Sequence, residues 1–471
     1  MRFPPSGRLA AVVAAGLLAL AAGPEARQPR QVSLIVSGGI VLPMDGRATV
    51  INPGSVAIDG TQIVAVGPAA EIAAAYSSAD TIDATGRVVM PGLINTHTHA
   101  PMVMFRGLAD DLALMDWLQK YIFPAEATLV SPEFVRVGTR LAALEMIRSG
   151  TTTFTDMYYF EDVIAREARN AGLRGVLGQT VIQFPVADAK TPAEALARAA
   201  RFIDEFAGDP LITPAVAPHA PYTLDTATLL ACRDLAMRKG VPLLIHLAET
   251  EDEVKAIEDR SGLRPVGYLD KIGFWGPRIV AAHGVWVDDA EIDVLKRNDV
   301  GIAHNPESNM KLASGTAPVP AYLAKGVAVG LGTDGAASNN DLDMFEAMRQ
   351  AAFVHKLVSR DPTAVSARTA LEMATAGGAR VLGRASDLGT LEAGKLADLI
   401  VVRMDQPRQT PMYNPESHLV YTTRGDDVET TIVNGRILMR DRVVLSLDEA
   451  AVLADARKMA ESVRQAVAPQ P

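Results

Sequence analysis

Cysteine is almost absent from this chain of 471 residues, since Cys232 is the only one. A single cysteine excludes an internal disulfide, and it excludes zinc or iron–sulfur sites built from clusters of cysteine. Positive charge is also in deficit, with 45 Lys and Arg residues against 55 Asp and Glu residues. The resulting net charge of −10 argues against nucleic acid or an anionic membrane surface as a partner.

Two common catalytic and binding motifs are missing as well. Neither GxxxxGK[ST] nor GxSxG occurs anywhere in the chain. The sequence therefore gives no support for nucleotide phosphate binding or for serine esterase chemistry. What remains is an ordinary globular composition, with 48% hydrophobic and 21% charged residues. The length fits one α/β barrel of roughly 250 residues together with a smaller domain.

Only one uninterrupted apolar run is long, and it lies at the N-terminus. It spans 14 residues, from Leu9 to Ala22, and follows the basic residues Arg2 and Arg8. A run this short is typical of a signal peptide rather than of a membrane span of about 20 residues. We expect residues 1–30 to be a cleaved signal peptide and the mature protein to be periplasmic or secreted. An uncleaved anchor or a misassigned start codon is the alternative.

Turn signals separate short apolar runs near both ends of the chain. They include SGG, MDG, NPG and IDG between Val32 and Pro68, and matching β-rich segments follow at 397–403 and 430–440. This pattern predicts a small composite β-sandwich domain built from residues 31–87 and 389–471, with a helix at the C-terminus.

Between these segments, eight apolar runs alternate with longer amphipathic, Ala-rich stretches. Alternation of this kind over residues 88–388 predicts an α/β fold, a (β/α)₈ TIM barrel. The apolar runs lie at 88–97, 151–157, 174–181, 212–219, 242–249, 279–285, 301–306 and 328–334.

Six of the eight histidines stand at or near the ends of these runs, where the strands of a barrel converge on the active site. His97 and His99 form a His-x-His pair, and their side chains face the same way on a strand because the side-chain period is two. His246 and Asp334 end the fifth and eighth runs. Three imidazoles and one carboxylate predict one bound Zn²⁺ per subunit, with Fe²⁺ or another divalent metal as the alternative.

Two further strand-end residues are expected to move protons. Glu249 lies three residues after His246 and is spare as a ligand, so it can act on a substrate nitrogen. Its alternative role is that of an acid in the first turn of a helix. His283, on the neighbouring strand, can orient or deprotonate a water together with Asp334.

The fourth run ends in His219 rather than in a lysine that could bridge two metals, so a single-metal site is favoured. His219 has no metal partner left and is expected to contact substrate instead. The segment HNPESN at 304–309 is expected to form a shaped loop that supports the site.

A series of segments stands in an order that resembles the amidohydrolase superfamily, in its single-zinc deaminase branch, from about residue 32 to the end. Within that branch the chain is most similar to the 5′-methylthioadenosine/S-adenosylhomocysteine deaminases. The segments are PGLINTHTHAPMVMFRGLADDL, DWLQKYIFPAEATL, APHAPYT, HLAET, AAHGV, HNPESNMKLASG, LGTDGAASNNDLDMF and LEAGKLADLIV.

The resemblance implies a zinc-dependent hydrolase that deaminates an adenine nucleoside to the inosine-type product and ammonia. It implies the metal ligands His97, His99, His246 and Asp334. Its implied catalytic residues are Glu249, His283 and Asp334. The residues expected to contact substrate are Glu126, at the ribose hydroxyls, and Trp117, Gln179, His219, Glu249 and Asp334.

One position departs from the family pattern. Members that bind the amino-acid tail of S-adenosylhomocysteine carry an arginine just after the apolar core of the third strand, where this chain has Gln179. A neutral amide cannot pair with a carboxylate through two charge-assisted hydrogen bonds. We therefore expect methylthioadenosine or adenosine to be preferred over S-adenosylhomocysteine.

Three rival functions stay open at the level of the sequence. An s-triazine hydrolase that removes chloride or amine uses similar metal chemistry, although a triazine has no ribose for Glu126 to bind. A cyclic-amide hydrolase is the second rival. A non-catalytic scaffold of the same fold is the third, but a scaffold would be expected to lose metal ligands and none is missing here. The sequence also leaves homo-oligomerisation open.

Overall fold

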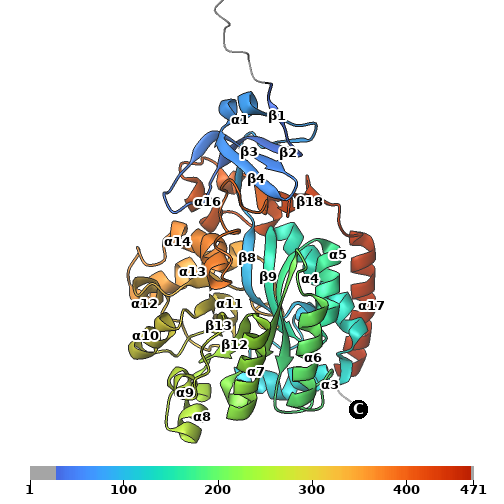
Figure 1. Ribbon diagram of the computed structural model, residues 1–471, viewed down its shortest axis with the longest axis vertical. Coiled ribbons are helices and arrows are strands. Elements are labelled where there is room, and N and C mark those ends of the chain that lie inside the picture. The colour runs from blue at the N-terminus through green and yellow to red at the C-terminus, as the bar shows by residue number, and fades with distance from the viewer. Residues whose placement is uncertain (1–27, 468–471) are drawn as a thin grey trace, which may run out of the picture.

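The computed structural model describes residues 28–467, so nearly all of the expected signal peptide lies outside the described residues. Figure 1 shows a barrel of strands and helices with a smaller β domain at one end of it. Within residues 28–467, no helix is both long and apolar enough to cross a membrane.

The (β/α)₈ barrel predicted for the middle of the chain is confirmed. Eight parallel strands pair in sequence order, and the last strand lies against the first, so the sheet closes into a nearly complete barrel. The strands are β8 (Leu93–Thr98), β9 (Thr151–Tyr158), β10 (Arg174–Val181), β11 (Ile212–Pro218), β12 (Leu243–Leu247), β13 (Ile279–His283), β14 (Gly301–His304) and β15 (Val329–Leu331).

Helices alternate with these strands, and several begin at a residue whose side chain caps the first turn. The Ser131 hydroxyl accepts from the N–H of Phe134 at the start of α4, and Asp288 caps α10 in the same way. Such caps satisfy amide groups that the first turn leaves unpaired. The helices are α4 (Pro132–Ser149), α5 (Glu161–Ala171), α6 (Pro192–Glu205), α7 (Thr226–Lys239), α8 (Glu251–Ser261), α9 (Pro265–Lys271), α10 (Asp289–Arg297), α11 (Pro306–Lys311), α12 (Val319–Ala324), α13 (Met344–Ser359), α14 (Ala367–Glu372) and α15 (Gly378–Val381).

The composite β domain is also confirmed, because strands from both ends of the chain pair in one nine-stranded sheet. β7 (Arg87–Pro91) and β16 (Leu399–Arg403) run antiparallel, with Met90 opposite Ile400. Apolar side chains from both segments share one buried core. The other strands of this sheet are β2 (Leu34–Val41), β3 (Ile51–Asp59), β4 (Gln62–Pro68), β6 (Thr81–Asp83), β17 (Val428–Val433), β18 (Arg436–Arg440) and β19 (Val443–Val444).

The apolar run at 88–97, predicted as one barrel strand, is two strands of different sheets. β7 ends at Pro91 in the β domain, and the barrel strand β8 begins at Leu93. Gly92 joins them at a point where a Cβ atom would lie 2.1 Å from the side chain of Thr152, so the close approach requires glycine. The chain therefore passes from the β domain into the barrel without a linker.

A helical segment between β8 and α4, residues Leu114–Leu129, is called the lid below. It consists of α2 (Leu114–Trp117), a π-helical turn (Leu118–Ile122) and α3 (Phe123–Leu129). Side chains of the lid line the same pocket as residues at the strand ends. The C-terminal helix α17 (Glu449–Val467) packs against α3 and α4 along one side of the barrel (Figure 1).

Candidate active site

The carboxyl ends of the barrel strands and the lid form one pocket. Most of the site residues predicted from the sequence line it, although they come from distant parts of the chain. His97 is buried beside it and is only 3% exposed. The predicted residues in the lining are His99, Trp117, Glu126, His219, His246, Glu249, His283 and Asp334.

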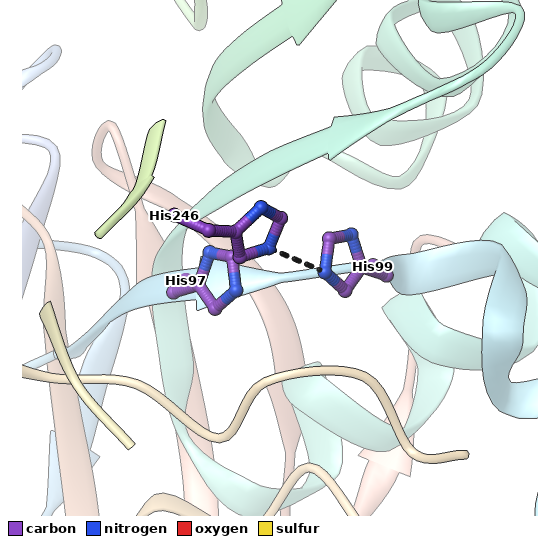
Figure 2. Close-up of side chains that lie close together, drawn as sticks. All are labelled: His97, His99 and His246. Carbon is purple, nitrogen blue, oxygen red and sulfur yellow. Dashed lines mark hydrogen bonds between the residues drawn. The ribbon is translucent and has the colours of Figure 1, made fainter. Parts of the chain in front are cut away.

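The three imidazoles predicted as metal ligands lie close together (Figure 2). His99 Nε2 lies 3.3 Å from His246 Nε2, and one nitrogen from each of the three rings lies within 4.8 Å of the others. Oδ1 of Asp334 lies 3.3 Å from His97 Nε2 and 3.4 Å from His99 Nε2. The four side chains therefore form one cluster of donor atoms at the ends of β8, β12 and β15.

Hydrogen bonds on the far sides of these groups orient them. His99 Nδ1 donates to the Met157 carbonyl at 2.7 Å, and His246 Nδ1 donates to the His219 carbonyl at 2.8 Å. Both Nε2 atoms are then left with free lone pairs. Asp334 Oδ2 accepts from Ser308 Oγ, in the HNPESN loop, at 2.7 Å. Partners of this kind fix the tautomer and direction of metal ligands.

His97 gives the clearest sign that a metal belongs in this cluster. Its Nε2 atom is buried, and the contact with Asp334 Oδ1 at 3.3 Å does not have the geometry of a hydrogen bond, so this nitrogen has no hydrogen-bond partner among the described residues. Burial lowers the pKa of His97 to about 4, so at neutral pH the ring is uncharged and its lone pair is available. An unpaired buried nitrogen costs free energy, and a cation in the cluster would remove that cost. Three imidazoles and one carboxylate fit Zn²⁺.

A carboxyl group and an imidazole stand beside the predicted metal ligands. Glu249 Oε2 lies 3.6 Å from His283 Nε2, and Ser314 Oγ donates to Glu249 Oε1 at 3.0 Å. Burial raises the pKa of Glu249, so it keeps its proton to a higher pH than an ordinary glutamate. Burial disfavours a charge on His283, but the carboxylate of Asp334, together with that of Glu249 whenever Glu249 is ionised, outweighs it and raises the pKa of His283. Asn309 Oδ1 accepts from His283 Nδ1 at 2.9 Å, which leaves Nε2 directed to Glu249.

The lid contributes one carboxyl group and several apolar side chains to the pocket. Tyr158 Oη donates to Glu126 Oε1 at 2.6 Å, and burial raises the pKa of Glu126 to about 7. The buried Trp117 Nε1–H has no partner among residues 28–467 and is free to donate to a ligand. His219 lines the pocket as a neutral ring, because burial lowers its pKa to about 3. The apolar lid residues in the lining are Leu114, Leu118, Ile122 and Phe123.

Gln179, predicted to contact substrate, does not line this pocket. Its side chain is buried, its amide donates to Asp188 Oδ2 at 2.9 Å, and Arg198 Nε donates to its oxygen at 3.3 Å. Thr180, the next residue on β10, lines the pocket instead, because successive side chains of a strand point to opposite faces. Among the described residues, no lysine or arginine lines the pocket.

Asp156 and Tyr158 belong to the site, although the sequence patterns did not single them out. Asp156 is fully buried, and its Oδ2 accepts from Thr98 Oγ1 at 2.7 Å and from the N–H of Ala100, on either side of His99. Burial raises the pKa of Asp156 to about 6. Both residues stand at the end of the second apolar run, so the strand-end rule that identified the histidines would have found them.

Comparisons with known proteins relate this site to a family. Residues 88–438 match the Amidohydrolase family. The chain is 49% identical over 434 residues to a 5-methylthioadenosine/S-adenosylhomocysteine deaminase of Syntrophobacter fumaroxidans, which covers 92% of this chain and 99% of that protein. It is 47% identical over 433 residues to a 5′-deoxyadenosine deaminase of Methanosarcina mazei, covering 91% and 98%. A zinc-bound adenosine deaminase of Xanthomonas campestris has a similar structure, with a TM-score of 0.91, 40% identity, and 93% and 100% of the two chains covered.

Proposed function

The chain belongs to the amidohydrolase family, and we propose that it is a zinc-dependent enzyme that hydrolyses the 6-amino group of adenine nucleosides. The observation that carries the proposal is the position of Glu249 beside the cluster of metal ligands, in a pocket that also presents Glu126. The first carboxyl group suits proton transfer to a ring, and the second suits the hydroxyls of a ribose. The two relatives and the solved structure are all named as deaminases of adenosine or of its 5′ derivatives, which supports the proposal.

One Zn²⁺ would be held by the cluster of His97, His99, His246 and Asp334. When bound there, the ion lowers the pKa of a coordinated water towards about 7 and so makes a nucleophile available at neutral pH.

Residues of the chain supply the proton transfers that the reaction needs. Glu249 gives its proton to N1 of the ring as oxygen adds to C6, while His283 or Asp334 accepts the proton that the water loses. That second proton then goes to the amine, which leaves as ammonia. Glu249 recovers a proton from the oxygen on C6 as the carbonyl forms. Every group thus returns to its starting state, and the net change is the exchange of C6–NH₂ for C6=O.

We further propose that the favoured nucleosides carry an uncharged 5′ group, as in methylthioadenosine, 5′-deoxyadenosine and adenosine. The lid presents apolar side chains such as Leu118 and Phe123 to the pocket. S-adenosylhomocysteine ends in a zwitterionic amino acid, and no lysine or arginine in the described lining can pair with its carboxylate. Burying an unpaired carboxylate is costly, so this tail would be disfavoured.

The proposed function is tested by a substrate screen on purified protein with its zinc content measured. The substrates are adenosine, methylthioadenosine, 5′-deoxyadenosine, S-adenosylhomocysteine, melamine and a cyclic imide. Deamination of the nucleosides by protein with about one zinc per chain is the expected result. Activity on melamine or on the imide alone would support a rival hydrolase, and a protein that binds little zinc would indicate a scaffold.

We also propose that the protein is exported, on the basis of its N-terminal sequence. The basic residues Arg2 and Arg8 and the apolar run that follows them support this proposal. These features lie outside the described residues. An exported enzyme would act on nucleosides that it meets outside the cytoplasm rather than on those made inside it.

A further inference from the structure

Glu126 is the only charged lid residue in the pocket lining, and a hydrogen bond ties it to the barrel. Tyr158 Oη donates to Glu126 Oε1 at 2.6 Å, and both side chains are buried. Glu126 stands on the short helix α3, which follows a π-helical turn, whereas Tyr158 ends the barrel strand β9. The position of the lid carboxylate therefore depends on a hydroxyl that the barrel supplies.

The end of β9 supports a metal ligand as well as the lid. The Met157 carbonyl accepts from His99 Nδ1 at 2.7 Å, and Tyr158 is the next residue. The rings of Tyr158 and His99 lie 6.2 Å apart, centroid to centroid. Adjacent residues of one strand thus fix the metal ligand and the lid carboxylate, so the strand sets the separation between them. A ligand that reacts at one end and is held at the other needs a fixed separation of this kind.

The carboxylate of Glu126 keeps capacity for a ligand. An ionised carboxylate offers about four acceptor positions, and the hydroxyls of Tyr158 and Tyr159 use at most two of them. Two neighbouring hydroxyls of a sugar can use the others. Burial raises the pKa of Glu126 to about 7, and the hydroxyls of Tyr158 and Tyr159 oppose this rise. Tyr158 therefore favours the charged form of Glu126, which is the better acceptor for sugar hydroxyls.

From these contacts we infer that Tyr158 is a positioning residue, which holds Glu126 toward the sugar and so sets a preference for nucleosides with free 2′- and 3′-hydroxyls. The inference rests on the proposed deaminase function. Without the Tyr158 hydroxyl, the Glu126 side chain could turn away from the sugar, while Glu249 and the metal ligands would keep their own partners. Loss of this hydroxyl should therefore weaken the binding of diol-bearing substrates and leave the chemical step unchanged.

The test compares adenosine with 2′,3′-dideoxyadenosine on the wild type and on Tyr158→Phe. The wild type should favour adenosine by about 10- to 100-fold in kcat/KM, as expected for hydrogen bonds to a charged group. Tyr158→Phe should reduce this preference by about 10-fold through a higher KM for adenosine, with kcat and zinc content unchanged. A purely structural role would affect both substrates alike, and equal losses on the two would overturn the inference.

Tyr268 provides a matched control outside the pocket. Its hydroxyl is hydrogen-bonded to Thr226 Oγ1 at 2.8 Å, and the residue is buried. Tyr268→Phe removes a buried tyrosine hydroxyl of the same kind from α9, far along the chain from the lid. It should leave the preference for adenosine unchanged. If it reduces the preference as much as Tyr158→Phe does, the effect is general and the inference fails.

Glu126→Gln tests the same link without altering Tyr158, and so covers the case in which Tyr158→Phe does not fold. Its amide oxygen can still accept from Tyr158, but the charge is lost, so the preference for adenosine should fall. A fully retained preference would overturn the inference. Adding Tyr158→Phe to Glu126→Gln should cause no further loss if Tyr158 acts through Glu126. A wild type that deaminates no adenine nucleoside would instead refute the proposed function, whereas an active wild type with an unchanged preference in Tyr158→Phe would refute the role of Tyr158 alone.

Discussion

Glu249→Gln should separate proton transfer from metal binding in this pocket. Ser314 Oγ donates to one oxygen of Glu249, and the amide oxygen of glutamine can accept that bond in the same way. The other oxygen, 3.6 Å from His283 Nε2, becomes an NH₂ group that cannot give a proton to the substrate. Since the four proposed ligands are untouched, the variant should keep its zinc.

The size of the effect follows from this division of roles. A positioned general acid contributes about 10²- to 10⁴-fold to a rate, so kcat should fall by at least about 10²-fold, which corresponds to roughly 2.7 kcal/mol. The KM should change little, because the side chain keeps its shape and its bond to Ser314. A loss that appears in kcat alone is the signature of an interaction made during the chemical step.

Zinc content and steady-state kinetics, measured on the same preparations, check this prediction. His246→Ala removes a proposed ligand and should lose both metal and activity. Glu258→Gln, on the neighbouring helix α8, makes the same chemical change on the exposed side of the protein and should leave both unchanged. If Glu249→Gln lost zinc as His246→Ala does, Glu249 would be a ligand and the assignment of roles would be wrong.

Three further predictions follow from the pocket, the fold and the N-terminus. The kcat/KM for methylthioadenosine and 5′-deoxyadenosine should exceed that for S-adenosylhomocysteine by about 10- to 100-fold. The reason is that the described lining of the pocket offers no charge-assisted hydrogen bond, worth roughly 1.5–3 kcal/mol, to the carboxylate of the amino-acid tail. A wild type that favours S-adenosylhomocysteine would contradict this prediction. Burial raises the pKa of Asp341 to about 7 in the folded protein, from an ordinary value of about 4. Between these pH values the folded protein holds a proton that the unfolded chain has released, so the free energy of unfolding falls as the pH rises from about 4 to 7. Asp341→Asn should therefore raise Tm by about 2 °C more at pH 8 than at pH 4, and equal shifts in thermal melts at the two pH values would count against it. N-terminal sequencing of the mature protein should begin between about residues 22 and 32, and an intact Met1 on soluble protein would refute export.

The cluster of candidate metal ligands could be predicted from the sequence because a barrel makes the ends of its strands meet. Once the apolar runs are counted, His97, His246 and Asp334 must converge whatever the details of packing are. The tautomers and the free lone pairs could not be predicted in this way. They depend on backbone carbonyls such as that of Met157, and no residue type in the sequence marks a carbonyl as a hydrogen-bond acceptor.

The contact between Glu126 and Tyr158 was also beyond the sequence. The two residues are 32 positions apart, on a helix and a strand that belong to different parts of the pocket wall. Helical spacing does not determine which carboxyl group of the lid faces inward, because the lid changes from α-helix to π-helix between Trp117 and Phe123. The π-helical turn shifts the face on which every later residue stands.

The position of Gln179 could not be predicted from the alternation of side chains along a strand. All eight residues of β10 are buried, because a parallel strand packs against the barrel interior on one face and against helices on the other. The pattern of apolar residues therefore cannot tell which face Gln179 occupies, and the structure places it with Asp188 and Arg198 rather than in the pocket.

Arg198 already has an ionic partner, since its Nε lies 3.1 Å from the buried carboxylate of Asp188. If Arg198 turned to pair with the tail of S-adenosylhomocysteine, the buried carboxylate of Asp188 would be left without this partner. The free energy gained from the new ion pair would have to exceed the free energy lost from the old one. The proposed discrimination against a charged tail would therefore rest on the whole lining of the pocket and on this existing ion pair, and not on residue 179 alone.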